Sequence, residues 1–208
     1  MRILRSAEYA TLAWKNGLGV SRVIASHPAI GGHDTADWQV STTDIGIDCP
    51  FSSLSGMDRQ FMLLAGAGVE LTCIDIINNV NVRRAVGAPF VPFAFSGDWE
   101  TTCRLLGEPV QVFNVMTRRS RASARIVLPR WRGPLFCEQR AGETVVAVLL
   151  EGEAQVSGDA LPLKPLESVV LDAPEGGRCA LVTGGDTARI AIVRLGPAPE
   201  PRRAVPPR

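Results

Sequence analysis

Short apolar runs broken by turn residues recur along the chain, and they set the expected secondary structure. The run Trp38–Ile45 is rich in β-branched residues and suits a half-buried strand. The runs Gln60–Ala65 and Val69–Ile77 follow, with a glycine-rich turn between them. No stretch keeps a helical period over the length that a clear helix needs, and Ala7–Ala13 is the best short exception. The pattern therefore predicts an all-β chain.

Further short apolar runs extend this pattern towards both ends. They are Arg22–Ser26, Val110–Val115, Leu135–Gln139, Thr144–Leu150, Ala154–Val156, Ser168–Leu171, Cys179–Val182 and Arg189–Leu195. By contrast, Asn78–Ala88 is polar and irregular and is expected to lie outside the strands. The first residues, Met1–Thr11, are expected to form a strand and a turn.

A weak internal repeat divides the chain. Leu63–Leu71 resembles Leu149–Val156, and Pro89–Asp98 resembles Pro162–Asp172. Short strands with glycine turns, repeated twice, are typical of two sandwiches or barrels of one kind. We therefore expect an N-terminal barrel over residues 1–117 and a C-terminal barrel over residues 118–196. Residues 197–208 hold five of the 15 prolines and are expected to be a disordered tail.

The composition limits the classes of partner. The chain has 208 residues, 46% of them hydrophobic, so a substantial core is available. The formal net charge of +1 argues against bulk electrostatic binding to nucleic acid or membrane. No apolar run has the length of a membrane span, and the first residues lack the apolar block of a signal peptide. A cytoplasmic location is expected, and a homodimer is left open.

Cysteine and histidine usage bears on redox and metal chemistry. The five cysteines, Cys49, Cys73, Cys103, Cys137 and Cys179, are dispersed without a C-x-x-C motif. Such a set indicates reduced thiols, most of them buried as small hydrophobes. The only histidines, His27 and His33, lie together in one Gly/Pro/Asp loop. Metal sites and Ser-His-Asp triads need well-placed ligands, so we expect no metal and no cofactor.

The stretch Trp14-Lys15-Asn16-Gly17-Leu18-Gly19 is the first candidate for binding chemistry. Its lysine is one of only two in the chain. An ammonium, a carboxamide and two glycines in close succession could hold an anionic or carbonyl group, because glycine lets the backbone approach a ligand. On spacing alone, a tight turn with an exposed lysine is the simpler interpretation.

Other polar residues stand next to apolar runs. Arg59 leads directly into an apolar strand, Asp98 follows an aromatic stretch, and Asn114 lies inside an apolar strand. A buried asparagine must find partners, so it is either a structural hydrogen-bond hub or a ligand contact. The segment Arg118–Arg132 contains six arginines. It is either a patch for phosphate or a partner, or, more simply, a solvated linker.

Five short motifs occur in the order seen in the HutD/Ves family, which this chain resembles. They are Trp14-Lys15-Asn16-Gly17-x-Gly19, Pro50-Phe51-Ser52, Gly56-x-Asp58-Arg59, Phe95-x-Gly97-Asp98 and Phe113-Asn114-x-Met116-x-Arg118-Arg119. The resemblance implies a cytosolic bacterial bicupin, with two cupin-like β-barrels in one chain and without the usual metal. It also implies a small-ligand binding protein, because some members are encoded with histidine-utilisation enzymes and formylglutamate or a related acid is their proposed ligand.

The chain departs from the family pattern at positions that bear on charge. Members commonly have Gly, Thr, Glu, Arg and Asp where this chain has Leu18, Ser21, Val23, Gln39 and Val112. Losing carboxylates and an arginine changes the charge of the expected pocket. The ligand of this chain therefore need not be that of the family.

These observations predict a small-molecule pocket in the N-terminal half. Lys15 would supply charge, Asn16 orientation and Arg59 a bidentate clamp on a carboxylate. Neutral hydrogen bonds would come from Ser41 and Asn114. Trp14 and Phe51 would form an apolar wall.

The expected function is binding of a small organic acid, formylglutamate-like or another amino-acid catabolite. A regulatory or buffering role in histidine catabolism would follow. The alternative is a metal-independent isomerase or hydrolase of amino-acid-derived acids, with Lys15 or Asp98 as the acid–base group. A third hypothesis assigns a nucleic-acid or protein partner to Arg118–Arg132.

Overall fold

The computed structural model describes residues 1–208 except 15–16, 30–34, 132, 184–187 and 199–208. Among the described residues, every regular element is a β-strand apart from one 3-10 turn, η1 (Ser6–Glu8). The predicted all-β class is therefore confirmed. No helix in the described part of the chain is long and apolar enough to cross a membrane.

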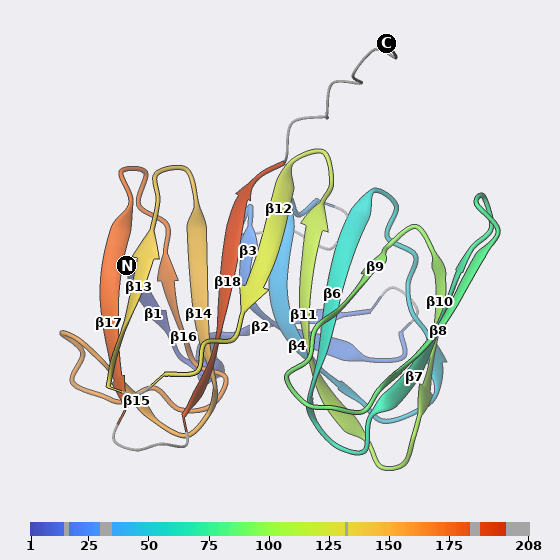
Figure 1. The fold of residues 1–208 in the computed structure, drawn as a ribbon, viewed down its shortest axis with the longest axis horizontal. Coiled ribbons are helices and arrows are strands. Elements are labelled where there is room, and N and C mark those ends of the chain that lie inside the picture. Colours follow the sequence, from blue (N-terminus) through green and yellow to red (C-terminus); the bar gives the residue numbers. More distant parts are fainter. Residues whose placement is uncertain (15–16, 30–34, 132, 184–187, 199–208) are drawn as a thin grey trace, which may run out of the picture.

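Figure 1 shows two β halves side by side. In the N-terminal half, a six-stranded sheet in the order β2-β3-β4-β11-β6-β9 packs on a four-stranded sheet in the order β5-β10-β7-β8. The strands are β2 (Ala10–Ala13), β3 (Val20–His27), β4 (Trp38–Ile45), β5 (Cys49–Pro50), β6 (Met57–Ala65), β7 (Val69–Asp75), β8 (Val80–Val86), β9 (Phe93–Ser96), β10 (Glu100–Leu105) and β11 (Val110–Arg118).

The C-terminal half repeats this arrangement with fewer strands. A five-stranded sheet in the order β1-β16-β14-β18-β12 packs on a three-stranded sheet in the order β13-β17-β15. The strands are β1 (Arg2–Leu4), β12 (Ala122–Val127), β13 (Pro134–Gln139), β14 (Thr144–Glu151), β15 (Ala154–Val156), β16 (Ser168–Leu171), β17 (Gly177–Thr183) and β18 (Arg189–Pro197).

The internal repeat corresponds to one crossing between sheets in each half. The segment β6 to β7 passes from the large sheet to the small one, and β14 to β15 does the same. Gly66 and Gly152 form the two turns with φ of +98° and +78°. A Cβ on Gly66 would lie 2.5 Å from the Pro109 carbonyl oxygen, so this turn needs glycine for both conformation and space.

The N-terminal strand belongs to the other half, so the predicted 1–117 barrel needs correction at its start. β1 pairs antiparallel with β16. Arg5 then binds the C-terminal half, donating to Glu167 and to the Pro162 carbonyl oxygen at 2.9 Å each and pairing with Asp159. Apolar Ile3 packs on the C-terminal core, which explains why this strand completes that sheet.

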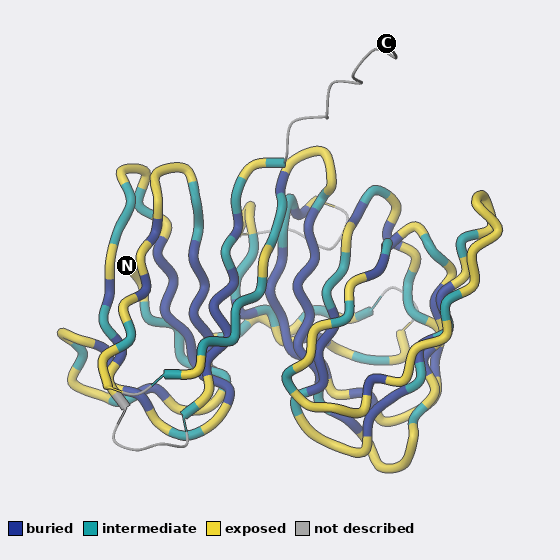
Figure 2. Tube along the Cα trace, viewed as in Figure 1, coloured by how far each residue is buried: buried dark blue, intermediate teal, exposed yellow. Residues whose placement is uncertain are grey.

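The two large sheets face each other across a shared core. Buried side chains from the N-terminal sheet, such as Phe113 and Val115, contact buried side chains from the C-terminal sheet, such as Val148 and Val193. Figure 2 shows this continuous buried zone in the middle of the molecule. The central strands β4, β6, β11, β14, β16 and β18 therefore have one face in a half's own core and one face in the shared core.

Three segments differ from their predicted structure. Asn78–Ala88 was expected to lack regular structure, but it contains β8, an edge strand whose residues are mostly exposed. The arginine-rich segment after Arg118 is not wholly a linker, because β12 pairs with β18. Ala7–Ala13 is not helical beyond η1 and ends in β2. Apart from Pro197 and Ala198, the predicted tail lies outside the described residues.

Candidate ligand-binding site

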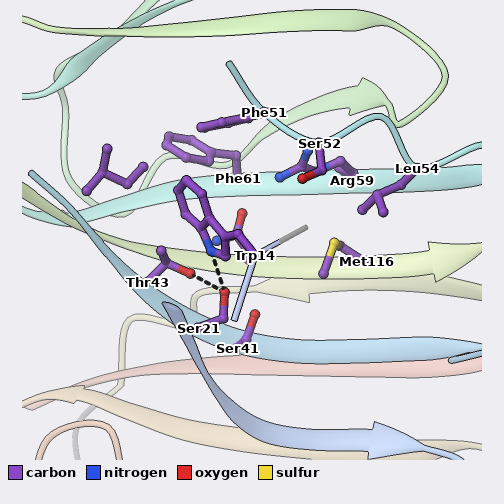
Figure 3. Close-up of a pocket in the computed structure, with 12 residues that line it drawn as sticks. Trp14, Ser21, Ser41, Thr43, Phe51, Ser52, Leu54, Arg59, Phe61 and Met116 are labelled. Atoms are coloured by element: carbon purple, nitrogen blue, oxygen red, sulfur yellow. Dashed lines mark hydrogen bonds between the residues drawn. The ribbon is translucent and has the colours of Figure 1, made fainter. Parts of the chain in front are cut away.

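A cavity lies in the N-terminal half, between one face of the six-stranded sheet and the side chains of Trp14 and of the segment that follows β5 (Figure 3). The centre of a water molecule can occupy about 40 Å³ of it. One water needs roughly 10–15 Å³ on this measure, so the space suits a group of a few heavy atoms. The lining comprises Trp14, Ser21, Ser41, Thr43, Ile45, Phe51, Ser52, Leu54, Arg59, Phe61, Asn114 and Met116.

Strand alternation brings these side chains together. Because successive side chains point to opposite faces of a sheet, Ser41, Thr43 and Ile45 of β4 point inward, while Val40 points to the shared core. Register then places Asn114 of β11 directly beside Ser41. The floor of the site is therefore assembled from four adjacent strands, β3, β4, β11 and β6.

Arg59 is the charged group of the cavity. Its guanidinium lies between two phenyl rings, with Cζ 4.9 Å from the Phe51 centroid and 5.0 Å from the Phe95 centroid. The residue as a whole is half-buried, but its Nε is shielded from solvent and has no hydrogen-bond partner. No carboxylate among the described residues lies within ion-pair distance of it. Burial lowers the pKa of Arg59 to about 10, so it stays protonated at neutral pH.

Neutral polar groups in the cavity are also unpaired. Ser41 Oγ and Asn114 Oδ1 are buried and have no hydrogen-bond partner. The neighbouring polar groups are satisfied, because Trp14 Nε1 donates to Ser21 Oγ at 3.1 Å and Ser21 Oγ lies 2.8 Å from Thr43 Oγ1 (Figure 3). Buried polar groups in proteins are nearly always paired, so Ser41 and Asn114 mark the cavity as a place for a polar molecule.

Gln39 adds a further unpaired group on the inward face of β4. It is 1% exposed, and neither its Nε2 nor its Oε1 has a partner. It stands opposite Met116, which lines the cavity.

Five of the seven predicted binding residues line this one cavity. They are Trp14, Ser41, Phe51, Arg59 and Asn114. The other two, Lys15 and Asn16, lie outside the described residues. Their flanks form a tight turn, in which Trp14 N donates to the Gly19 carbonyl oxygen at 2.9 Å. Trp14 itself lines the cavity and lies edge-on to Phe51, with ring centroids 6.1 Å apart.

Asp98 does not line the cavity. Its carboxylate accepts from Gly56 N at 2.7 Å, from Ser96 Oγ at 2.9 Å and from Arg119 Nη1 at 3.0 Å. These contacts, led by the Gly56 amide, lower the pKa of Asp98 to about 2. Its ionised, fully bonded carboxylate holds a turn together and is not placed to exchange protons with a molecule in the cavity.

Sequence reasoning did not single out several lining residues. Ser21, Thr43, Ser52, Phe61 and Met116 were missed because short neutral or apolar residues carry no chemical signal on their own. The period of β4 was the available clue. Once Ser41 is placed inward, Gln39, Thr43 and Ile45 must share its face.

The C-terminal half has an apolar interior instead. Its core contains Leu149, Val156, Leu163 and Leu181, all fully buried. Among the described residues, no three His, Cys, Asp or Glu side chains come together as a metal site would require. His33 lies outside the described residues, and His27 stacks on Trp38 with ring centroids 6.3 Å apart. The absence of a metal stays a prediction.

Fold and cavity together define a cupin-like β protein with a small polar site inside one half. Residues 6–189 match the HutD family, and the chain belongs to that family, which is associated with histidine utilisation. A Pseudomonas putida relative, an uncharacterised 21.2 kDa protein in the hutC 3′ region, is 32% identical over 126 residues. That match spans 61% of this chain and 63% of the relative.

Solved structures agree with this assignment. HutD from Pseudomonas fluorescens SBW25, in a formate condition, is 27% identical with a TM-score of 0.75, covering 94% of this chain and 98% of that one. A conserved protein of unknown function from Pseudomonas aeruginosa PAO1 is 27% identical with a TM-score of 0.78 and the same coverage. Bacillus subtilis oxalate decarboxylase, 7% identical with a TM-score of 0.62 over 94% of this chain and 77% of its own, shares the fold alone.

Proposed function

We propose that the N-terminal cavity binds the carboxylate of a small organic acid. The observation that carries this proposal is Arg59, a protonated guanidinium with a shielded Nε and no carboxylate partner among the described residues. Its Cζ lies over the rings of Phe51 and Phe95, so its N–H groups are the part left for an anion. Arginine matches a carboxylate bidentately, and such bonds are stronger than neutral ones.

Two neutral groups define the rest of the bound molecule. Ser41 Oγ can donate or accept, whereas the unpaired Asn114 Oδ1 only accepts. The acid should therefore carry an N–H or O–H donor near its carboxylate. Lys15 and Asn16 would add charge and orientation from the adjoining loop.

The size of the cavity limits how the acid enters. About 40 Å³ for water centres accommodates a carboxylate and a few more heavy atoms. A formylglutamate-like acid is larger, so it would need Trp14 or Phe51 to move aside. An amino-acid catabolite of this kind, bound in the cytoplasm, would let the protein sense or buffer an intermediate of histidine catabolism.

A screen for ligand-induced stabilisation tests the proposal. Amino-acid-derived acids are added to the purified protein, and the melting temperature is measured. An acid at about a hundred times its Kd should add roughly 2.7 kcal/mol of apparent stability. The same samples, analysed for product by NMR, test the alternative of an isomerase or hydrolase, since a binding protein leaves the acid unchanged and isomers, which share one mass, differ in their spectra.

Variants locate the binding in this cavity. Arg59→Met keeps an apolar stem but removes the charge. It should lower the affinity for the acid by roughly ten- to a hundredfold, because hydrogen bonds to charged groups contribute about 1.5–3 kcal/mol. Lys15→Met should act in the same direction. Arg83→Met is the matched control, since Arg83 pairs with Glu70 at the surface. Equal dissociation constants for wild type and Arg59→Met would overturn the proposal.

A further inference from the structure

Two pairs of cysteines face each other across neighbouring strands, one pair in each half. Cys49 of β5 stands directly opposite Cys103 of β10, and Cys137 of β13 stands directly opposite Cys179 of β17. All four thiols are free and buried. Directly opposed residues in antiparallel strands have Cα atoms about 4.5 or 5.5 Å apart, and disulfides span about 4.4–6.8 Å. Both pairs therefore lie within the Cα separation that a disulfide spans.

The Cys49–Cys103 pair adjoins the wall of the cavity. β5 consists of Cys49 and Pro50 alone, and the chain then runs directly into Phe51, Ser52 and Leu54, which line the cavity. A further bond ties the same two segments, because Phe51 N donates to the Thr101 carbonyl oxygen at 2.8 Å. A covalent link at Cys49 would therefore hold the start of this wall against β10.

We propose that Cys49 and Cys103 form a reversible disulfide that fixes the Phe51–Leu54 wall of the cavity. The oxidant is a low-molecular-weight disulfide such as glutathione disulfide. One thiolate attacks it, forming a mixed disulfide and releasing one glutathione thiolate. The second protein thiol loses its proton and displaces the other glutathione. The protein loses two electrons and two protons, and two molecules of reduced glutathione are formed.

Burial determines when this reaction occurs. It raises the pKa of the Cys49 thiol and raises that of Cys103 to about 12, so neither is a ready nucleophile in the closed structure. β5, however, is an edge strand joined to β10 through only two register pairs. Local opening of so short an edge strand exposes the thiols. The rate of disulfide formation should rise with pH, because the fraction of thiolate grows.

The Cys137–Cys179 pair is a matched comparator inside the same chain. It has the same cross-strand geometry but lies on β13 and β17, which contribute no residue to the cavity. The hydrogen bond between the two thiols lowers the pKa of Cys179 and, with burial, raises that of Cys137. Its oxidation should leave the cavity wall unaffected.

The experiment uses the full chain and glutathione disulfide. After incubation, remaining thiols are alkylated in denaturant, and peptides are mapped by mass spectrometry. We expect a Cys49–Cys103 cross-linked peptide that dithiothreitol removes. In the oxidised protein, backbone amides of residues 51–54 should exchange with deuterium roughly tenfold more slowly than in the reduced protein.

Variants distinguish a local effect of the Cys49–Cys103 disulfide on residues 51–54 from a general effect of oxidation on the whole protein. The slower exchange should persist when both Cys137 and Cys179 are replaced by Ala, and it should vanish in Cys49→Ala and, independently, in Cys103→Ala. The proposal fails if Cys49 and Cys103 yield only mixed disulfides, pair with Cys73, or stay reduced. It also fails if oxidised Cys49→Ala, with only the comparator pair closed, shows the same slowing.

Discussion

At the scale of single residues, several of the buried polar groups that lack a partner gather at the cavity. Elsewhere in the N-terminal half, Arg22, Arg83, Arg104 and Arg119 find carboxylates. Inside the cavity, Arg59, Ser41 and Asn114 each keep an atom without a partner. An unsatisfied buried group costs roughly 1–3 kcal/mol, so the free protein is less stable than a filled, apolar interior would make it.

Ser41→Ala should therefore not destabilise the free protein. The hydroxyl is fully buried and makes no hydrogen bond, so its removal should leave the free energy of unfolding unchanged or raise it by up to about 1 kcal/mol. Ser168→Ala is the control, because Ser168 is equally buried but lies 3.2 Å from Tyr9 Oη. It should lose about 1 kcal/mol in urea unfolding. Similar losses in both variants would mean that Ser41 is bonded in solution.

Asp98 should make stability depend on pH in the acidic range. Its pKa is lowered in the folded protein from 3.8 to about 2, chiefly by the Gly56 amide. A carboxyl group with a depressed folded pKa stabilises the fold above its unfolded pKa and stops doing so as pH falls through the folded value. Asp98→Asn should therefore be less stable than wild type at pH 7, and the difference should shrink between pH 4 and pH 2. A difference that stays constant over that window would contradict this.

At the scale of elements, the strands that the sequence predicted are apolar or β-branched runs whose residues are largely buried. The Trp38–Ile45 run matches β4 to the residue, because its β-branched residues suit a strand, and all of Gln39–Thr43 are buried. β8 was missed because only Val86 of its seven residues is buried, so an edge strand leaves no alternation to detect. β12 was hidden by Arg125 and by the arginines that flank it, although Ala124 and Ile126 pack on the shared core and Ala122 is buried.

The site was predictable only in part for a related reason. Arg59 and Asn114 stand out because charge or amide is unexpected beside apolar residues. Gln39 and Thr43 can be assigned to the site only after the strand register places them beside residues of the neighbouring strands. The cavity depends on contacts among strands distant in sequence, and local patterns do not encode those contacts directly.

The end of β18 sets how much of the C-terminus can be removed. Ser123 Oγ donates to the Pro197 carbonyl oxygen at 2.9 Å, and Ala198 N donates to the Arg121 carbonyl oxygen at 3.2 Å. Truncation after Ala198 should leave the melting temperature unchanged. Truncation after Gly196 removes both bonds and should cost about 1–2 kcal/mol, at about 1 kcal/mol for each. A lower melting temperature for the chain that ends at Ala198 would show that residues 199–208 contribute to packing.

At the scale of the whole molecule, the two halves are joined in two ways. The large sheets share a core, and β1 crosses from the start of the chain into the sheet of the C-terminal half. Arg5 and Tyr9 reinforce the crossing, since Tyr9 Oη donates to the Leu166 carbonyl oxygen at 2.5 Å. The N-terminal half, which holds the cavity, is therefore packed against a C-terminal half that has an apolar core of its own.

This coupling predicts that both halves unfold in one cooperative transition. The five buried cysteines provide native probes, because Cys49, Cys73 and Cys103 report on the N-terminal half, while Cys137 and Cys179 report on the other. Under reducing conditions, the urea dependence of thiol alkylation, followed by mass spectrometry, should give coincident midpoints for the two groups. Separate domains would instead give two midpoints.

Two substitutions make that test decisive. Phe113→Ala removes a fully buried ring from the shared core and should cost roughly 3–5 kcal/mol, moving both groups of thiols together. Leu181→Ala lies only in the C-terminal core and should cost roughly 2–5 kcal/mol. If the halves are coupled, the N-terminal thiols must also become reactive at a lower urea concentration in Leu181→Ala, at the same midpoint as Cys137 and Cys179. If they stay protected while Cys137 and Cys179 react, the shared core does not bind the halves into one folding unit, and the cavity stands on the N-terminal half alone.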